Sequence, residues 1–424
     1  MKGQGLTITL VSIVLLIADA YFIGGIRAAL KKWKFSHTKA FTIIYWIVCV
    51  SLITGVLLSI YVKLSVGMRA AFMFAFFILL IVKATFLLFM LADDIRRLVV
   101  RLKNRNKKPE SVPVAPDSNT IPRSEFLMKA GLIAGAVPLA SIGFGILSGA
   151  YDYRVVHQTL YLPNLPKAFD GVKLGQISDI HSGSFHHNIA VKGGVDMLMR
   201  EKPDFIFFTG DLVNFRTVEV NFYQHIFEKV KAPLGVYSCL GNHDYGDYSP
   251  WLVGAARKKN MDDMLQAHKN MGWDLLMNEN RRLKVDGEEI GILGIENWGA
   301  LGRFPKYGRM DLAVKNTDDL PVKLLLSHDP SHWDAQVLPQ YPQIDVMFSG
   351  HTHGMQFGVR TNDFQWSPVE YIYKQWAGHY QQQNQQLYVN VGYGFFGLPG
   401  RVGILPEITI FTLRSGAAPP SSKV

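Results

Sequence analysis

Long apolar runs fill the first third of the chain, and short apolar runs separated by polar loops fill the rest. Four runs, at about 5–25, 41–62, 70–92 and 126–148, reach the ~20 residues that a helix needs to cross a bilayer. The basic, proline-containing stretch before the fourth run is typical of a linker. The pattern therefore predicts a three-helix transmembrane region over 1–100, a linker over 101–125, a fourth helix over 126–150 and a folded domain over 151–424.

The fourth run differs from the first three because it is rich in Gly and Ala. The residues from Pro122 to Lys129 that lead into it resemble a twin-arginine export signal that has lost one arginine. Two interpretations stay open, an ordinary fourth span and a signal-derived anchor. The ordinary span is the favoured interpretation.

Basic residues are concentrated around the apolar runs. Residues 1–150 hold 18 Lys and Arg against 6 Asp and Glu, whereas residues 151–424 hold 26 against 28. The net charge of +10 therefore belongs to the membrane region, and the second part offers no polybasic face, so we expect no nucleic acid among its partners.

The distribution of these charges also predicts the orientation in the membrane. The loops at 27–39 and 96–123 are basic, which by the positive-inside rule places them in the cytoplasm. The domain over 151–424 would then face the periplasm or the cell exterior. If the fourth run were only interfacial, that domain would be cytoplasmic instead.

Asp19 and Lys83 are ionisable residues inside apolar runs, where a charge is costly. Each lies about two-thirds of the way along its run, and the first and third helices run in the same direction. We predict an interhelical ion pair at a common depth. The alternative is that Asp19 lies at the interface and Lys83 extends its amine toward water.

From about residue 172 the pattern changes to short apolar runs that alternate with segments of helical periodicity, which indicates an α/β fold. Polar residues follow the carboxyl end of each run, where open α/β sheets bind ligands. Two later strands are expected to build a second sheet, which gives a β-sandwich flanked by helices. The predicted strands are 172–177, 204–209, 235–240, 323–326, 344–348, 387–391 and 408–413, and the predicted helices are 190–200, 223–230 and 260–271.

The polar residues after these strands form an ordered series of motifs. A single Asp-x-His or His-x-His is usually a surface pair or a core histidine, but five motifs in order predict a two-metal phosphoesterase. Their carboxylate, imidazole and amide groups suit two divalent ions, Mn, Fe, Zn or Mg, and a shared carboxylate can hold them close enough for a bridging hydroxide. The motifs are Asp179-x-His181, Gly210-Asp211, Gly241-Asn242-His243-Asp244, His328 and Gly350-His351-Thr352-His353-Gly354.

The order of these motifs resembles that of the calcineurin-like metallophosphoesterase superfamily over about residues 155–414. The segments Ser178–Gly183, Gly350–Gln356, Gly397-Leu398-Pro399 and Pro406–Thr409 resemble its membrane-anchored bacterial branch. Met355 departs from the branch, which often has a second glycine there, and is expected to alter the lip of the site. The resemblance implies a four-layer αββα sandwich.

The resemblance also implies a role for each polar residue. One ion would be bound by Asp179, His181 and His353, the second by Asn242, His328 and His351, and Asp211 would bridge the two. His243 would act beside the leaving group, as an acid or a hydrogen-bond donor, with Asp244 orienting it.

Two further residues are candidates for substrate contact. His187 follows the first motif in a predicted loop and could reach a phosphate, although a solvated loop residue is the favoured alternative. Arg401 lies in a glycine-rich segment and has the planar geometry that suits an anion.

These expectations combine into a multi-pass enzyme of the bacterial inner membrane that hydrolyses a phosphomonoester or phosphodiester of an envelope or lipid-linked metabolite. Its partners would be a phosphorylated small-molecule or lipid-like substrate and the membrane. One alternative is a pyrophosphohydrolase of a nucleotide-linked lipid precursor with a cytoplasmic site. Another is a non-catalytic membrane sensor or scaffold, which is disfavoured because all seven candidate ligands and His243 are present.

Overall fold

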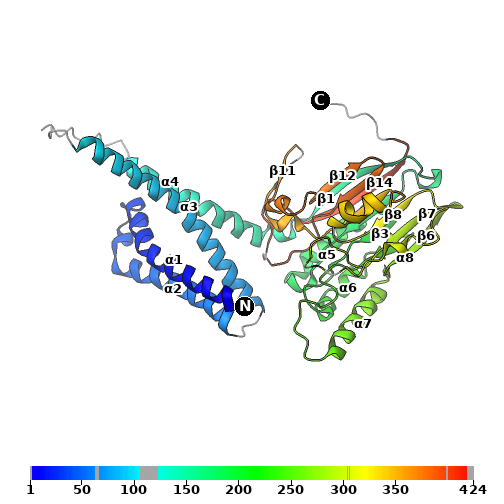
Figure 1. The fold of residues 1–424 in the computed structure, drawn as a ribbon, viewed down its shortest axis with the longest axis horizontal. Coiled ribbons are helices and arrows are strands. Elements are labelled where there is room, and N and C mark those ends of the chain that lie inside the picture. Colours follow the sequence, from blue (N-terminus) through cyan, green and yellow to red (C-terminus); the bar gives the residue numbers. More distant parts are fainter. Residues whose placement is uncertain are drawn as a thin grey trace. The chain divides into compact units, whose positions relative to one another are not determined.

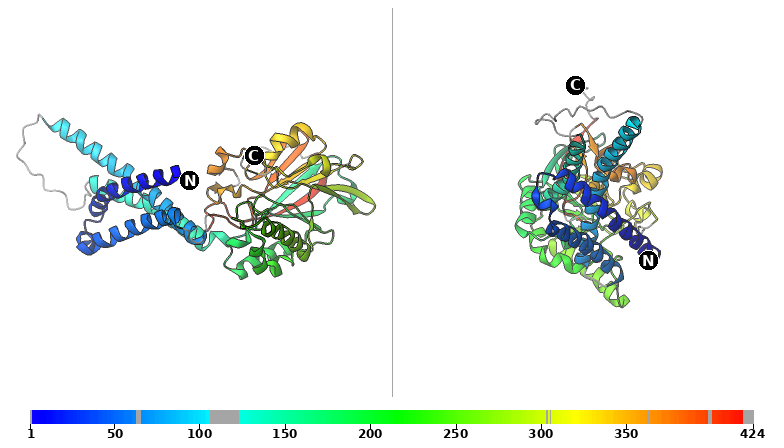
Figure 2. Two further views of the ribbon diagram at one scale, coloured as in Figure 1. Left: turned by 60° about the horizontal axis from the view of Figure 1, so that its bottom comes forward. Right: turned by 90° about the vertical axis from the view of Figure 1, so that its left-hand side faces the viewer.

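The computed structural model describes residues 2–62, 66–105, 123–302, 304, 306–361, 363–397 and 400–417. The chain divides into two compact units, Met1–Gly143 and Phe144–Val424. Among the described residues every strand lies in the second unit, and the first unit is helical (Figure 1 and Figure 2). Most of the predicted linker, 106–122, lies outside the described residues.

The first unit consists of long apolar helices. Within the described part of the chain, four helices are long and apolar enough to span a membrane, over Thr9–Ala29, Lys39–Ser59, Ala75–Lys103 and Ser124–Tyr151. Many of their large apolar side chains point outward, as lipid-facing side chains do. The helices are α1 (Lys2–Ala29), α2 (Lys39–Tyr61), α3 (Val66–Asn104) and α4 (Arg123–Leu147), of which the last four residues, from Phe144, belong to the second unit.

Helix α3 is longer than the apolar run that predicted it, and α4 begins earlier, so both ends of the predicted linker are helical. The reason is a buried carboxylate, Asp93, that stabilises both helices. It accepts from Arg96 Nη2 at 2.8 Å and Arg97 Nε at 2.7 Å, one turn away on α3. Ser124 Oγ, at the start of α4, donates to the same carboxylate at 2.9 Å.

The predicted ion pair between Asp19 and Lys83 is confirmed. Asp19 Oδ1 on α1 lies 2.5 Å from Lys83 Nζ on α3, and both side chains are buried. Tyr45 of α2 donates its hydroxyl to the same oxygen at 2.7 Å. One polar cluster therefore joins three helices of the first unit.

Two six-stranded sheets form the centre of the described part of the second unit. The first has the order β1-β14-β2-β3-β4-β5, with β1 at Arg154–Leu162, β14 at Glu407–Ser415, β2 at Lys173–Ile177, β3 at Phe205–Phe208, β4 at Val236–Ser238 and β5 at Asp274–Leu275. The second has the order β12-β13-β9-β8-β7-β6, with β12 at Gly378–Gln382, β13 at Gln385–Val389, β9 at Val346–Ser349, β8 at Lys323–Leu326, β7 at Glu288–Gly294 and β6 at Glu279–Val285.

The two sheets pack face to face, and helices cover their outer faces. Phe205 and Phe207 of β3 meet Leu324 and Phe348 of the second sheet in the core between the layers. Helices α5 (Asn188–Arg200), α6 (Gln224–Phe227) and α7 (Gly254–Met271) cover the first sheet, and α8 (Met310–Ala313) packs with the second (Figure 1). The fold is therefore the predicted four-layer αββα sandwich.

The prediction that both late strands lie in the second sheet is wrong for β14. Only β13 joins the second sheet, whereas β14 inserts into the first, parallel to β1 and antiparallel to β2. Apolar residues on both faces of β14 allow this central position, because Ile410 packs toward the helices and Phe411 toward the other sheet. Strand β1, its partner, was not among the predicted strands.

A small hairpin of β10 (Val359–Arg360) and β11 (Gln365–Trp366) stands apart from the two large sheets. Phe357, just before it, forms a parallel bridge with Val402. The hairpin is thereby tied to the glycine-rich segment that contains Arg401.

Candidate metal centre

The carboxyl ends of strands from both sheets meet at one edge of the sandwich and bring the predicted ligands together. Asp179 follows β2, Asp211 follows β3, and Asn242 follows β4 in the first sheet. From the second sheet, His328 follows β8 and His351 follows β9. The site therefore depends on the packing of two separate sheets.

The backbone at the site is strained. Five predicted ligands have a positive φ, which is uncommon for residues other than glycine and persists only where the surroundings enforce it. Gly350 shows how close the packing is, because a Cβ there would lie 2.0 Å from Ser178 Oγ and 2.1 Å from Asp179 Oδ2. The five ligands are Asp179 (φ 51°), His181 (φ 47°), Asp211 (φ 61°), His351 (φ 73°) and His353 (φ 51°).

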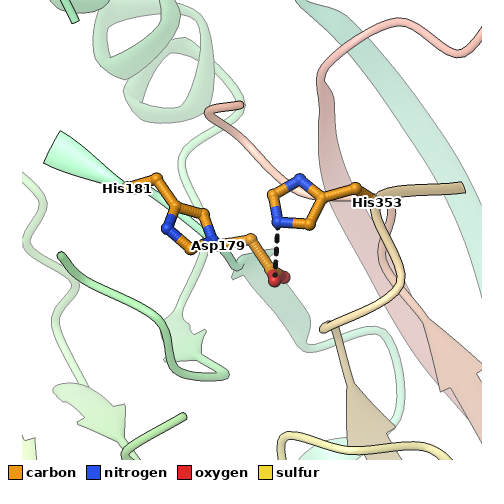
Figure 3. Close-up of side chains that lie close together, drawn as sticks. All are labelled: Asp179, His181 and His353. Carbon is orange, nitrogen blue, oxygen red and sulfur yellow. Dashed lines mark ion pairs between the residues drawn. The ribbon is translucent and has the colours of Figure 1, made fainter. Parts of the chain in front are cut away.

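Asp179, His181 and His353 form a first group whose ligand atoms all lie within 4.8 Å of one another. In Figure 3 the His353 ring points a nitrogen at the Asp179 carboxylate, and the His181 ring lies beside them. His353 Nε2 lies 3.2 Å from Asp179 Oδ1. All three side chains are buried, so a charge there requires a partner.

Asp211, His328 and His351 form a second group of the same compactness. Asp211 Oδ2 lies 3.1 Å from His328 Nε2 and 3.5 Å from His181 Nε2, which belongs to the first group. One carboxylate oxygen is thus shared between the two groups. That is the position a bridging ligand occupies.

The electrostatics keep this carboxylate ionised. Burial alone would raise its pKa, but the nearby His328 and His243 imidazoles outweigh burial and hold the pKa of Asp211 well below its usual range. Metal ligands must be deprotonated, so the carboxylate is in the form that binds a cation.

Hydrogen bonds fix the orientation of two of the imidazoles. His181 Nδ1 lies 3.0 Å from the Asn214 side-chain oxygen, and His328 Nδ1 lies 2.7 Å from the Thr209 carbonyl. Because these oxygens can only accept, Nδ1 donates a hydrogen bond in both rings, and Nε2, which faces Asp211, is the nitrogen left for a metal ion.

His351 is oriented the other way round. Its Nε2 lies 2.8 Å from the Tyr373 hydroxyl, which in turn donates to Asp329 Oδ2 at 3.4 Å. This chain places the proton on Nε2 and leaves Nδ1, 3.2 Å from His328 Nε2, for a ligand.

The donor set fits two divalent cations. The side-chain oxygen of Asn242 and Nε2 of His353 are buried and have no hydrogen-bond partner among the described residues. Buried polar atoms normally have partners, so these two are available to a bound ion. Carboxylate, imidazole and amide donors suit Mn, Fe, Zn or Mg.

His243 and Asp244 are placed differently from expectation. The structure holds His243 through Nδ1, which lies 2.6 Å from the Asn214 carbonyl, and not through Asp244. Asp244 accepts instead from the backbone N–H groups of Gly241 at 2.9 Å, Leu212 at 2.8 Å and Asp211 at 3.0 Å. Its carboxylate therefore ties together two ligand loops, and the expectation that it orients His243 is wrong.

The two predicted substrate contacts lie outside the ligand groups. Arg401 is buried, with its guanidinium donating to the Gly394 carbonyl at 2.9 Å and approaching His353 Nδ1 to 3.2 Å. That burial is at odds with a direct phosphate contact and places Arg401 behind a ligand. His187 is exposed, and its Nδ1 accepts from Ala190 N at the start of α5.

Sequence reasoning missed Asn214 and Tyr373. Asn214 lies only three residues after Asp211, so its distance from the motif was a usable signal. Tyr373 lies 22 residues beyond His351, with which it forms a hydrogen bond, and nothing in the local pattern indicates that contact.

The αββα sandwich carries two ligand groups at its strand ends, each made of one carboxylate and two imidazoles. This combination defines the class of metal-dependent phosphoesterases. The family described as "Calcineurin-like phosphoesterase" matches residues 172–355. The family "Probable Calcineurin-like phosphoesterase, transmembrane domain" matches residues 4–150.

Similar proteins occur in bacteria and animals. The "Uncharacterized metallophosphoesterase YkuE" of Bacillus subtilis is 31% identical over 305 residues, which cover 69% of this chain and 98% of that protein. The "Transmembrane protein with metallophosphoesterase domain" of Danio rerio is 28% identical, over 64% of this chain and 60% of that protein. The "UDP-2,3-diacylglucosamine pyrophosphatase LpxG" of Chlamydia trachomatis is 28% identical, over 46% of this chain and 68% of that protein.

The chain belongs to the calcineurin-like phosphoesterase family. It is a membrane protein and a hydrolase of phosphoester bonds.

Proposed function

We propose that this protein hydrolyses a phosphomonoester or phosphodiester of an envelope or lipid-linked metabolite at a dinuclear metal centre. The observation that carries the proposal is the shared Asp211 carboxylate, which lies within 3.5 Å of an imidazole from each ligand group. Two divalent ions held there would act as Lewis acids on the phosphoryl oxygens and lower the pKa of water to near neutrality.

The residues of the chain would divide the work. Asp179, His181 and His353 would hold one ion, and Asn242, His328 and His351 the other, with Asp211 between them. His243 is half-buried and donates through Nδ1 to Asn214, which fixes the ring. Its Nε2 would donate a hydrogen bond or a proton to the leaving oxygen.

The test uses the full-length protein purified in detergent, with nitrophenyl phosphate and bis-nitrophenyl phosphate as substrates and Mn, Fe, Zn or Mg added in turn. We expect Asp211→Asn to lower bound metal and activity, and His243→Ala to lower activity by about 10²- to 10⁴-fold with metal retained. Asp196→Asn, a partly exposed position on α5 that pairs with Lys192, is the matched control. A wild type that is inert with every metal, or a fully active Asp211→Asn, would contradict the proposal.

A second candidate activity is hydrolysis of the pyrophosphate bond of a nucleotide-linked lipid precursor. The similarity to the Chlamydia trachomatis UDP-2,3-diacylglucosamine pyrophosphatase favours it. A UDP-linked diacyl sugar offered beside the two nitrophenyl esters separates the candidates, because only a pyrophosphatase would release UMP.

A further inference from the structure

The chain between two residues of the metal centre makes an excursion to the surface. It leaves after His353, a predicted ligand, and returns at Tyr373, which forms a hydrogen bond with His351. We call residues 354–372 the rim segment. It contains the β10–β11 hairpin, and both of its ends are fixed at the site.

The rim segment exposes an unusual number of large apolar side chains. It is nevertheless anchored, because Val369 packs with Trp376 and Ile404 in a small core shared with the neighbouring chain. The exposed side chains are therefore not a failure of packing, and such clusters mark interaction surfaces. They are Met355, Phe357, Val359, Phe364, Tyr371 and Ile372, which are 40% to 77% exposed.

The same segment is tied to the end of the fourth candidate span. Val402 exchanges backbone hydrogen bonds with the rim segment, accepting from Gly358 N at 2.9 Å and donating to Gln356 O at 2.7 Å. Its neighbour Arg401 donates its backbone N–H to Gly145 O at 3.2 Å. Gly145 lies within the fourth candidate span, Ser124–Tyr151.

Close packing makes this tie short. A Cβ at Gly145 would lie 2.6 Å from Arg401 O, so only glycine allows the helix to approach residues 401–402 this closely. The backbone of Arg401 and Val402 therefore links the helix to Gly358 of the rim segment. Gly145 lies near the end of the fourth candidate span, so this contact brings the rim segment close to the part of that helix that would leave a bilayer.

We propose that the rim segment inserts its apolar side chains into the interfacial region of the bilayer that the fourth span crosses. Side chains such as Phe364 and Tyr371 would be buried among headgroups and the first acyl carbons, as apolar anchors of membrane-surface proteins are. The metal centre, from which both ends of the rim segment leave, would then lie close to the membrane surface. If the proposed function holds, a phosphate group carried on a lipid would reach the metal centre without leaving the bilayer.

The test labels single introduced cysteines with an environment-sensitive fluorophore in the full-length protein, which is then placed in phosphatidylcholine vesicles. The native cysteines, Cys49 and Cys239, are buried, so the label goes to the introduced one. Phe364→Cys and Val359→Cys probe the rim segment. Leu312→Cys, an exposed apolar position on α8, is the matched control.

We expect lipids brominated on the first acyl carbons to quench the labels at positions 359 and 364 at least twofold more strongly than the label at 312. Equal quenching at all three positions, or no quenching at 359 and 364, would overturn the proposal. A disulfide between two copies through Phe364→Cys, without quenching by brominated lipid, would overturn it in favour of a dimer. The readout requires no turnover, so it stands apart from the outcome of the hydrolysis assays.

Discussion

Asn214 contacts two histidines of the candidate centre through different groups. Its side-chain oxygen accepts from His181, a predicted ligand, and its backbone carbonyl accepts from His243, the predicted acid. Glu219 holds Asn214 in turn, accepting from its backbone N–H at 2.6 Å. A single residue therefore orients both the predicted metal ligand His181 and the predicted proton donor His243.

We predict that Asn214→Ala lowers kcat by about 10- to 100-fold, because an unsupported His181 binds its ion less well. Asn214→Asp keeps an oxygen acceptor and should retain more activity than Asn214→Ala. The measurements are kcat, KM and metal content of the purified protein, with the exposed Asn270→Ala as control.

A purely structural role would change KM and kcat of the two Asn214 variants alike. Loss of metal from the alanine variant, with recovery in the aspartate variant, is the result that a positioning role requires. Full activity of Asn214→Ala would contradict it.

For individual residues, the sequence predicted which side chains meet at the metal centre but not which hydrogen bonds orient each of them. The seven candidate ligands follow strand ends, so their meeting was predictable from the pattern of apolar runs. The hydrogen bonds of Asp244 and Arg401 could not be predicted, because both side chains bond to backbone groups. Every residue has the same backbone groups, so the sequence does not indicate which of them a side chain contacts. Both residues proved to be buried supports of ligand loops.

The helices of the first unit are joined by the buried pair of Asp19 and Lys83. Two residues of α2 also contact the pair. Tyr45 donates a hydrogen bond to Asp19, and Cys49 Sγ lies 3.7 Å from Lys83 Nζ. Removing one partner of a buried pair leaves an uncompensated charge, which costs about 3–5 kcal/mol.

We predict that Asp19→Asn and Lys83→Met each lower the thermal midpoint of the detergent-solubilised protein, and that the double variant loses less than the sum. The expected coupling between them is about 0.5–3 kcal/mol. Melting curves of the four proteins form the double-mutant cycle. Additive losses would show that the two charges act independently.

Elements with strong local patterns were predictable, and those that depend on partners were not. The runs of β3 and β8 are buried at every position and apolar except for Lys323 at the start of β8, and both were identified directly. The sheet that β14 joins depends on β1, whose pattern of half-buried residues carries no strong signal. The extension of α3 depends on Asp93 and its two arginines. These residues are charged, so a search for apolar runs ends before them.

The distribution of charge over the whole molecule bears on its orientation. The excess of basic residues lies in residues 1–150, and the net charge of residues 151–424 is close to zero. With four spans and the basic loops in the cytoplasm, the second unit would lie outside the cytoplasm.

We predict that a reporter fused after residue 417 signals an extracytoplasmic position. Alkaline phosphatase fused there should be active and green fluorescent protein dark, with fusions after Asn104 giving the opposite pattern as the control. A cytoplasmic signal from both positions would contradict the orientation and would favour the pyrophosphatase with a cytoplasmic site.

The place of β14 has a consequence for biosynthesis. Since β14 lies between β1 and β2 and bonds to both, the first sheet stays open until residues 407–415 have been made. Such distant pairings form slowly, after the intervening chain is available. A domain exported during synthesis would therefore cross the membrane unfolded, and it could acquire its metals only on the far side.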